Sequence, residues 1–181
     1  MIGQMAASRD IIRDYVALTK PRILSLLLLT AVCGMFLAAE GPPSAPLVAL
    51  VVMGGALAAG GAHALNHYLD RDVDLLMTRT RNRPVAGGRV SPGQAFVFGI
   101  LLNSIAFLIL ATLVNPLSAI LTLSATIFYV LVYTMGLKRS TPQNIVIGGA
   151  AGAVPPMVGW AAVTGQVDLP AIYLFAIVFF W

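Results

Sequence analysis

Charged side chains are scarce in this sequence of 181 residues. Asp, Glu, Lys and Arg make up 10% of it, whereas 59% of the residues are hydrophobic. Soluble domains usually carry about 25% charged residues, so the composition excludes an ordinary water-soluble fold. Long uncharged stretches predict an all-α fold instead, a polytopic bundle of transmembrane helices that forms a single domain over residues 1–181.

Cysteine is almost absent as well. The one cysteine, Cys33, lies within the first apolar run. A single thiol excludes a disulfide framework, and the sequence has no cysteine pair spaced for a metal ion. We therefore interpret Cys33 as a small buried residue of a packed helix.

Apolar runs take the place of the missing charges. Five of them approach the roughly 20 residues that cross a hydrocarbon core: Ile23–Ala39, Pro46–Leu65, Ala95–Val114, Leu117–Leu137 and Ile145–Val163. A sixth run begins at Leu169 and reaches Trp181 after 13 residues. We expect five full spans and a truncated sixth, and so the N-terminal part of a longer protein. Pro155 and Pro156 should break or kink the fifth span.

Basic residues are missing from every second connection. The outer connections contain Glu40 and Asp168, whereas Lys and Arg occur only before the first span, between residues 71 and 89, and at Lys138 and Arg139. By the positive-inside rule, the N-terminus is a short cytoplasmic segment and the basic loops are cytoplasmic. Anionic lipid headgroups account for the net charge of +4, and no nucleic-acid partner is needed.

Polar residues gather where the second span ends. Asn66, Asp70 and Asp74 are four residues apart, and each step of four turns only about 40° around a helix. Their side chains should form one stripe roughly 12 Å long, while Asp72 points away. Carboxylates at a membrane edge are costly and functional by default. Oxygen ligands of this kind suit Mg²⁺, which also binds substrate phosphates.

Arginines follow the acidic stripe at positions 79, 81, 83 and 89. Their planar forks pair with phosphate oxygens, so the stretch predicts a clamp for Mg²⁺ and a diphosphate at the cytoplasmic membrane surface. The alternative is a solvated loop whose arginines only set the topology. An isoprenyl diphosphate fits a diphosphate site above a helix-lined apolar cavity.

Several segments carry a family resemblance. The pattern NxxxDxxxD followed by RTRNRP resembles the first aspartate-rich motif of the UbiA superfamily of intramembrane prenyltransferases. The segments YVALTKPRI and LKRSTPQNIVIGGAAGAVPPMVGWAAVTG are similar to the protoheme IX farnesyltransferase, or haem O synthase, family. The resemblance runs along almost the whole chain.

This resemblance implies transfer of a farnesyl group from farnesyl diphosphate to a vinyl group of haem B, giving haem O, in the bacterial inner membrane. It implies that Asn66, Asp70 and Asp74 hold Mg²⁺ and diphosphate. It also implies that Arg79, Arg83 and Lys138 contact diphosphate oxygens, and that Tyr133 joins Asp70, Asp74 and Lys138 in catalysis. Tyr133 precedes Lys138 by five residues instead of the commoner four.

The family pattern includes a second polar motif in a later loop, so we expect residues 1–181 alone to be inactive. The implied partners are the lipid bilayer, haem B as a substrate, and haem A synthase or the terminal oxidase assembly. Lys20 and Arg22 are candidates for the haem propionates. We interpret His63 as a satisfied helix-packing residue, while His67 beside Asn66 could move a proton or bind a headgroup.

Two alternatives stay open. A prenyltransferase with a quinone-precursor or chlorophyll-type acceptor would use the same clamp. A membrane transporter or ion-binding protein would place its charged groups near the bilayer midplane, whereas here the acidic residues lie at one edge.

Overall fold

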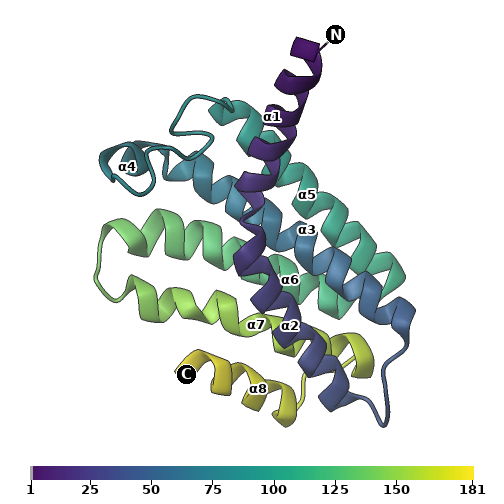
Figure 1. Ribbon diagram of the computed structural model, residues 1–181. Helices are drawn as coiled ribbons and strands as arrows, with labels where there is room; N and C mark the ends of the chain where they lie inside the picture. Colours follow the sequence, from purple (N-terminus) through teal and green to yellow (C-terminus); the bar gives the residue numbers. More distant parts are fainter. Residues whose placement is uncertain (1) are drawn as a thin grey trace.

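The protein is a bundle of α-helices (Figure 1). The computed structural model describes residues 2–181, with side chains from Asp10 onward, so the side chain of Arg9 lies outside the described part. No strand occurs in residues 2–181. The helices are α1 (Ile2–Thr19), α2 (Pro21–Ala38), α3 (Ala45–Leu69), α4 (Arg71–Leu76), α5 (Pro92–Leu113), α6 (Pro116–Ile127), the π-helix η1 (Phe128–Gly136), the 3₁₀ turn η2 (Leu137–Arg139), α7 (Asn144–Thr164) and α8 (Leu169–Phe180).

Proline marks the start of five of the eight α-helices described. It occupies one of the first two positions of α2, α3, α5, α6 and α8, where its missing N–H group costs no helical hydrogen bond. Ser91 and Gln94 form a reciprocal capping box at the start of α5. The side chain of Asn115 accepts a hydrogen bond from the Ser118 N–H at 2.8 Å and caps α6. Local sequence therefore sets where the helices begin.

Within residues 2–181, five helical segments are long and apolar enough to cross a membrane: Pro21–Ala38, Ala45–Leu69, Pro92–Leu113, Pro116–Arg139 and Asn144–Thr164. They confirm the five predicted spans, and α8 is the shorter sixth. The loop after α4 and the turn between η2 and α7 lie at one end of the bundle, and the other turns between spans lie at the opposite end (Figure 1). The two basic loops thus share one side, as predicted.

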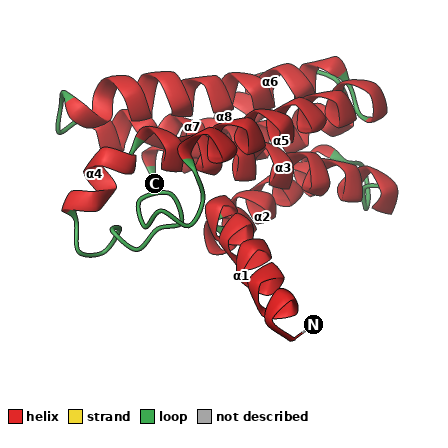
Figure 2. Cartoon of the chain, turned by 90° about the horizontal axis from the view of Figure 1, so that it is seen from above, coloured by secondary structure: helices red, strands yellow, loops and turns green. Residues whose placement is uncertain are grey.

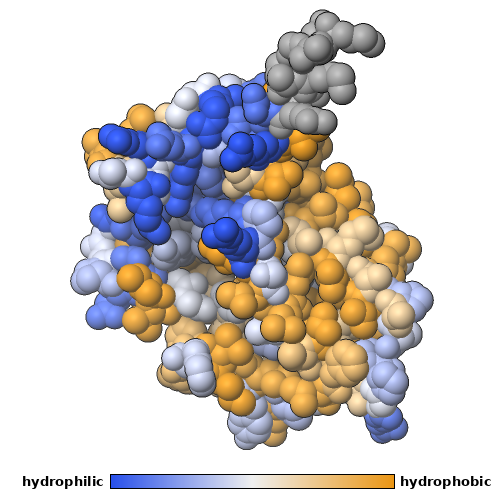
Figure 3. Space-filling model, in the orientation of Figure 1, coloured by the Kyte–Doolittle hydropathy of each residue, from blue (hydrophilic) through white to orange (hydrophobic). Residues whose placement is uncertain are grey.

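The surface divides in the same way. Hydrophilic side chains gather at the end that carries α4 and the following loop, and apolar side chains cover the flanks (Figure 3). Large apolar residues such as Leu26, Leu108 and Ile177 are more than half exposed, as expected for helices that face lipid. Cys33 is also exposed, so our interpretation of it as buried was wrong: it lies on the outer face of α2.

Helix α3 is the centre of the bundle, and it packs against α5, α2 and α1. Helices α2 and α7 form another large contact. An added Cβ atom at Gly159 would overlap the Ala31 carbonyl, and one at Gly34 would overlap the Pro156 carbonyl. These two glycines let the helix backbones touch, which is the usual role of small residues between membrane helices.

Of the two predicted effects of the proline pair, a break or a kink, the break does not occur. Helix α7 runs from Asn144 to Thr164 with Pro155 and Pro156 inside it. A proline costs a helical hydrogen bond and crowds the preceding turn. Here the close contact with α2 at Gly34 and Gly159 holds the segment helical, so tertiary packing outweighs the local preference.

The N-terminal segment forms a helix that the sequence did not predict. Seen from above, α1 projects from the bundle (Figure 2). Its last turns pack on α3, where Leu18 is fully buried with Ala64 and Ala95. The backbone then turns at Lys20, the one non-glycine residue in the described chain with a positive φ, at 51°.

The contact between α2 and α7 gives a stability prediction. Gly159→Ala should destabilise the bundle by about 1–3 kcal/mol because the new methyl group meets the backbone of α2. Gly152→Ala is the matched control on the same helix, since nothing lies within 4 Å of its added Cβ. Thermal unfolding in detergent checks both variants, and equal melting temperatures would contradict the close contact.

Candidate active site

The predicted stripe exists. Helical hydrogen bonding continues through the junction of α3 and α4, from the Asp70 N–H to the Asn66 carbonyl at 2.9 Å and from the Asp74 N–H to the Asp70 carbonyl at 2.8 Å. The exposed fractions of Asn66, Asp70 and Asp74 are 2%, 1% and 3%. Two carboxyl groups and an amide are therefore buried in one line at the membrane edge.

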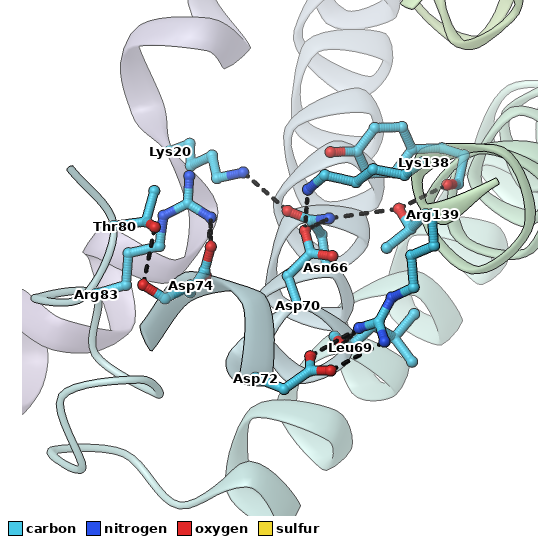
Figure 4. A network of polar contacts seen from close by, with 12 residues as sticks. Lys20, Asn66, Leu69, Asp70, Asp72, Asp74, Thr80, Arg83, Lys138 and Arg139 are labelled. Atoms are coloured by element: carbon cyan, nitrogen blue, oxygen red, sulfur yellow. Dashed lines mark hydrogen bonds and ion pairs between the residues drawn. The ribbon is translucent and has the colours of Figure 1, made fainter. Parts of the chain in front are cut away.

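Each member of the stripe has a basic partner from another element (Figure 4). Lys20 donates to Asn66 Oδ1 at 3.1 Å, and Lys138 forms an ion pair with Asp70. One Arg83 nitrogen lies 2.9 Å from both carboxylate oxygens of Asp74. Three positive charges thus compensate two buried carboxylates, as buried charges require.

Internal hydrogen bonds fix the stripe further. Asn66 Nδ2 donates to Asp70 Oδ2 at 2.7 Å and lies 3.4 Å from Thr134 Oγ1. The Thr80 hydroxyl donates to the Asp74 carbonyl at 3.0 Å. Asp70 Oδ1 remains buried without a hydrogen-bond partner. One carboxylate oxygen is therefore left for a ligand.

Asp72 points away from the stripe, as predicted. Its carboxylate accepts hydrogen bonds from both terminal nitrogens of Arg139, at 2.7 and 2.9 Å. This partner holds the pKa of Asp72 below its usual range. Arg139 also donates to the Leu69 carbonyl at 2.9 Å, so the surface pair ties η2 to the end of α3.

The position of Lys20 beside the stripe was not predicted from the sequence. It was a candidate for the haem propionates, yet its ammonium group points at Asn66 between the charged residues of the stripe. Burial lowers its pKa to about 8, with Arg83 and Lys138 lowering it further and Asp70 and Asp74 opposing them. Arg22, the other candidate, is exposed and outside both cavities described below.

The segment before Lys138 has π-helical geometry over Phe128–Gly136. The Thr134 hydroxyl donates to the Tyr129 carbonyl five residues earlier, at 2.9 Å. A π-helix pairs residues five positions apart; Tyr133 lies within this segment, and Lys138 follows in η2. The rings of Tyr129 and Tyr133 stack with their centroids 5.3 Å apart.

An apolar cavity of about 340 Å³ lies beside the stripe. Its walls come from α2, α3, the span formed by α6 and η1, and α7, and they include His63, Tyr129, Tyr133, Gly149 and Gly152. His63 is 7% exposed, and neither ring nitrogen has a hydrogen-bond partner. The interpretation of His63 as a satisfied packing residue was therefore wrong: its ring forms a T-shaped pair with the Tyr129 ring, with centroids 5.8 Å apart, and its nitrogens have no partner.

A second, polar cavity of about 700 Å³ lies between α1 and the loop after α4. Arg79 lines this cavity together with Lys20, Arg83 and His67. The structure therefore brings Asn66, Asp70, Asp74, Arg83 and Lys138 into one network, with Tyr133 on the adjoining apolar wall, and it leaves Arg79 outside the direct contacts.

The donor set fits Mg²⁺ only with help from a ligand. Among the described residues, no three His, Cys, Asp or Glu side chains cluster to hold a metal ion by themselves. Asp70 and Asp74 offer carboxylate oxygens, Asn66 offers an amide oxygen, and Asp70 Oδ1 is unpaired. Mg²⁺ commonly binds one or two carboxylates and completes its shell with water and substrate phosphates.

Comparison with known protein families gives one match. The model of the UbiA prenyltransferase family matches residues 27–181. The chain belongs to the UbiA prenyltransferase family. Membership of this family of enzymes also disfavours the transporter alternative.

Curated relatives resemble this chain over nearly all of its length. The chain is 55% identical over 174 residues to protoheme IX farnesyltransferase of Symbiobacterium thermophilum, covering 96% of this chain and 58% of the relative. It is 51% identical to the protoheme IX farnesyltransferase of Parafrankia sp., covering 99% of this chain and 57% of the relative. The chain thus spans somewhat more than half the length of these curated relatives.

Solved structures share the fold. A UbiA homologue from Archaeoglobus fulgidus bound to GPP and Mg²⁺ matches 92% of this chain and 60% of its own, with a TM-score of 0.77 and 22% identity. A digeranylgeranylglyceryl phosphate synthase matches 93% of this chain and 58% of its own, with a TM-score of 0.80 and 16% identity. At these identities the likeness concerns the helical architecture alone.

The buried position of Lys20 gives a prediction about pH. Its folded pKa of about 8 lies below the ordinary 10.5, so its charged form opposes folding below pH 8 and this cost fades as the pH rises from 8 towards 10.5. In the metal-free protein, the labelling rate of Lys20 by an amine reagent should rise through a midpoint near pH 8. Peptide mass spectrometry measures it.

A variant tests the cause of this shift. Arg83→Gln removes one of the positive charges that lower the pKa of Lys20, so the labelling midpoint should move to higher pH. A wild-type midpoint near 10.5 would contradict the burial of the ammonium group.

Proposed function

We propose that the full-length protein transfers a farnesyl group from farnesyl diphosphate to a vinyl group of haem B and so forms haem O. The observation that carries the diphosphate half is the buried stripe of Asn66, Asp70 and Asp74, paired with three bases beside an apolar cavity. The acceptor half is supported by the relatives at 51–55% identity, which are named protoheme IX farnesyltransferases.

The acidic stripe and the basic residues would have different roles. Asn66, Asp70 and Asp74 would hold Mg²⁺, which when bound neutralises charge on the diphosphate. Lys138, Arg83 and Lys20 stand within reach of the same place and would pair with diphosphate oxygens. Cations fixed where negative charge develops stabilise the departing group without rearrangement. Arg79 has no ion-pair partner among the described side chains and lines the polar cavity, so we place it outside this clamp.

The apolar cavity would take the hydrocarbon part of the donor. Its volume of about 340 Å³ lies in the range of ligand pockets, roughly 300–1,000 Å³. The stacked rings of Tyr129 and Tyr133 form part of the wall. Aromatic faces attract cations, so these tyrosines would stabilise the allylic cation left after the C–O bond breaks, while the dry wall keeps water away from it.

We further propose the setting of this reaction. The basic end of the bundle, with the active-site loops, would face the cytoplasm of a bacterial cell, with the N-terminus on the same side. Haem A synthase or the terminal oxidase assembly are candidate partners, because they use the product. The longer relatives support a site that residues outside this chain complete, so the 181 residues alone would be inactive.

The stripe predicts a contrast between two neighbouring aspartates. In the full-length protein, Asp70→Asn should abolish haem O formation, because an amide cannot supply the charge that a metal ion and Lys138 require. Asp72→Asn is the matched control, since Asp72 is exposed and paired with Arg139 outside the stripe. Mass spectrometry of extracted haem measures the gain of one farnesyl group plus one water.

Three outcomes of this experiment separate the proposals. If Asp70→Asn formed product at the wild-type level, the proposed clamp for Mg²⁺ and diphosphate would be contradicted. Product from the 181-residue chain alone would show that the stripe needs no second motif. Unchanged haem with the wild-type protein would exclude haem as the acceptor, and prenylated quinone precursors would be the next products to examine.

The ion pairs predict cooperation between metal and diphosphate. Without a ligand, Lys138 and Arg83 occupy the carboxylates that Mg²⁺ needs, so Mg²⁺ alone should bind weakly. A diphosphate draws both bases to itself and frees the carboxylates. The dissociation constant of Mg²⁺ should therefore fall about tenfold or more when a non-reactive farnesyl thiodiphosphate is present.

Calorimetry in both orders of addition checks this coupling, because the thiodiphosphate must gain the same factor from Mg²⁺. Asp70→Asn should abolish the coupling, and Asp72→Asn should retain it. Equal Mg²⁺ affinity with and without the thiodiphosphate would show that the internal ion pairs do not compete with the metal.

A further inference from the structure

The polar cavity contains more recognition groups than the diphosphate clamp uses. Helix α1 and the loop after α4 form its walls, and its volume of about 700 Å³ is twice that of the apolar cavity. Lys20 and Arg83 stand where it meets the clamp. The other charged residues on its walls are Asp10, Arg13, Asp14, Arg79 and Arg89.

Two of these arginines have free donors. Arg89 is paired with Asp14, at 2.9 and 3.1 Å from its two carboxylate oxygens. In contrast, neither Arg13 nor Arg79 forms an ion pair with any described side chain. An unpaired guanidinium group recognises a carboxylate or phosphate through its planar fork, so the cavity favours an anionic ligand.

His67 gives independent evidence for a ligand. It lines the cavity, it is 2% exposed, and neither of its ring nitrogens has a hydrogen-bond partner. Leaving a buried polar group unpaired costs about 1–3 kcal/mol, and such groups call for an explanation. A neutral imidazole has one N–H donor, which an anion in the cavity would satisfy.

Three residues near the end of α3 face different parts of the site. His63 lines the apolar cavity, Asn66 belongs to the clamp, and His67 lines the polar cavity. A ligand in the polar cavity thus lies on the other side of the diphosphate from the hydrocarbon chain. The acceptor needs binding groups outside the clamp, because the diphosphate occupies the bases of the clamp while the new bond forms.

We propose that the polar cavity binds the carboxylate groups of the acceptor, with Arg13 and Arg79 as their ion-pair partners and His67 as a hydrogen-bond donor. This inference rests on the proposed function. Haem carries two propionates on the edge of the macrocycle opposite its vinyl groups, so carboxylates anchored in the cavity leave the vinyl edge free to react. The depth of His67 favours this ligand over a lipid headgroup at the bilayer surface.

The test compares a porphyrin dicarboxylate with its dimethyl ester. Zinc protoporphyrin IX and its diester bind to the purified full-length protein in nanodiscs, and fluorescence titration gives both dissociation constants. The wild-type protein should prefer the free acid by about tenfold or more. Arg13→Gln should bring this preference close to one, with binding of the diester and of farnesyl thiodiphosphate unchanged.

Matched variants separate the cavity from general surface charge. Arg79→Gln and His67→Phe should each reduce the same preference. Arg22→Gln removes an equal charge at the same end of the bundle but outside the cavity, and it should retain the wild-type preference. A reduction by Arg22→Gln equal to that of Arg13→Gln would overturn the proposal in favour of unspecific attraction.

The remaining outcomes show whether the polar cavity binds another ligand, the donor or a lipid, in place of the acceptor. Equal wild-type affinity for acid and diester would overturn the proposal, although haem O formation, measured separately, would leave the proposed function intact. An effect of Arg13→Gln on thiodiphosphate affinity alone would assign the cavity to the donor. An effect on retention of anionic phospholipid alone would assign it to lipid, and either result would overturn carboxylate recognition.

Discussion

Burial of two carboxylates at the edge of a membrane is the constraint on which the rest of the site depends. Asp70 and Asp74 are almost inaccessible, and unpaired charges in such a place would cost far more than a helix bundle can supply. Their partners come from two separate segments, Arg83 in the loop after α4 and Lys138 in η2. A third segment contributes Lys20, at the junction of α1 and α2, which donates to Asn66 of the same stripe. The acidic stripe therefore positions elements that are distant in sequence, and the loop between α4 and α5 folds back over the bundle because Asp74 needs Arg83.

The same pairing prepares the site for an exchange of partners. Each base that neutralises the stripe is also a group that a diphosphate would attract, and each carboxylate released is a ligand for a divalent ion. The charges of the ligand-free site are satisfied internally, so the protein need not hold unpaired charge while it waits for substrate. Asp70 Oδ1 is the exception, because Lys138 pairs with the other oxygen of this carboxylate, Oδ2. The same side chains thus neutralise the site without a ligand and would bind the metal ion and the diphosphate.

Helical periodicity was enough to predict the stripe, the five spans and the shared side of the basic loops, because each follows from spacing or local composition. The roles of Lys20, His63 and His67 could not be read in this way. Lys20 enters the clamp through a backbone turn with positive φ, and the two histidines, four residues apart, line different cavities made by other helices. The π-helical segment before Lys138 and the unbroken course of α7 through Pro155 and Pro156 likewise differ from what local preferences predict. The family resemblance supplied Tyr133 and Lys138, which no local pattern singled out.

Helix α7 shows how small residues can serve packing and binding on one element. Gly159 lies against the backbone of α2, where even one methyl group would overlap a carbonyl. Gly149 and Gly152, two to three turns earlier, face open space in the apolar cavity. The first glycine fixes the distance between helices, and the other two keep volume free for a hydrocarbon chain. Because Pro155 and Pro156 lie between these two regions, the close contact with α2 stabilises the turn that the prolines weaken. The glycines of the cavity wall can then leave space open while α7 stays helical. The packing of α7 on α2 thus maintains the apolar space beside the charged stripe.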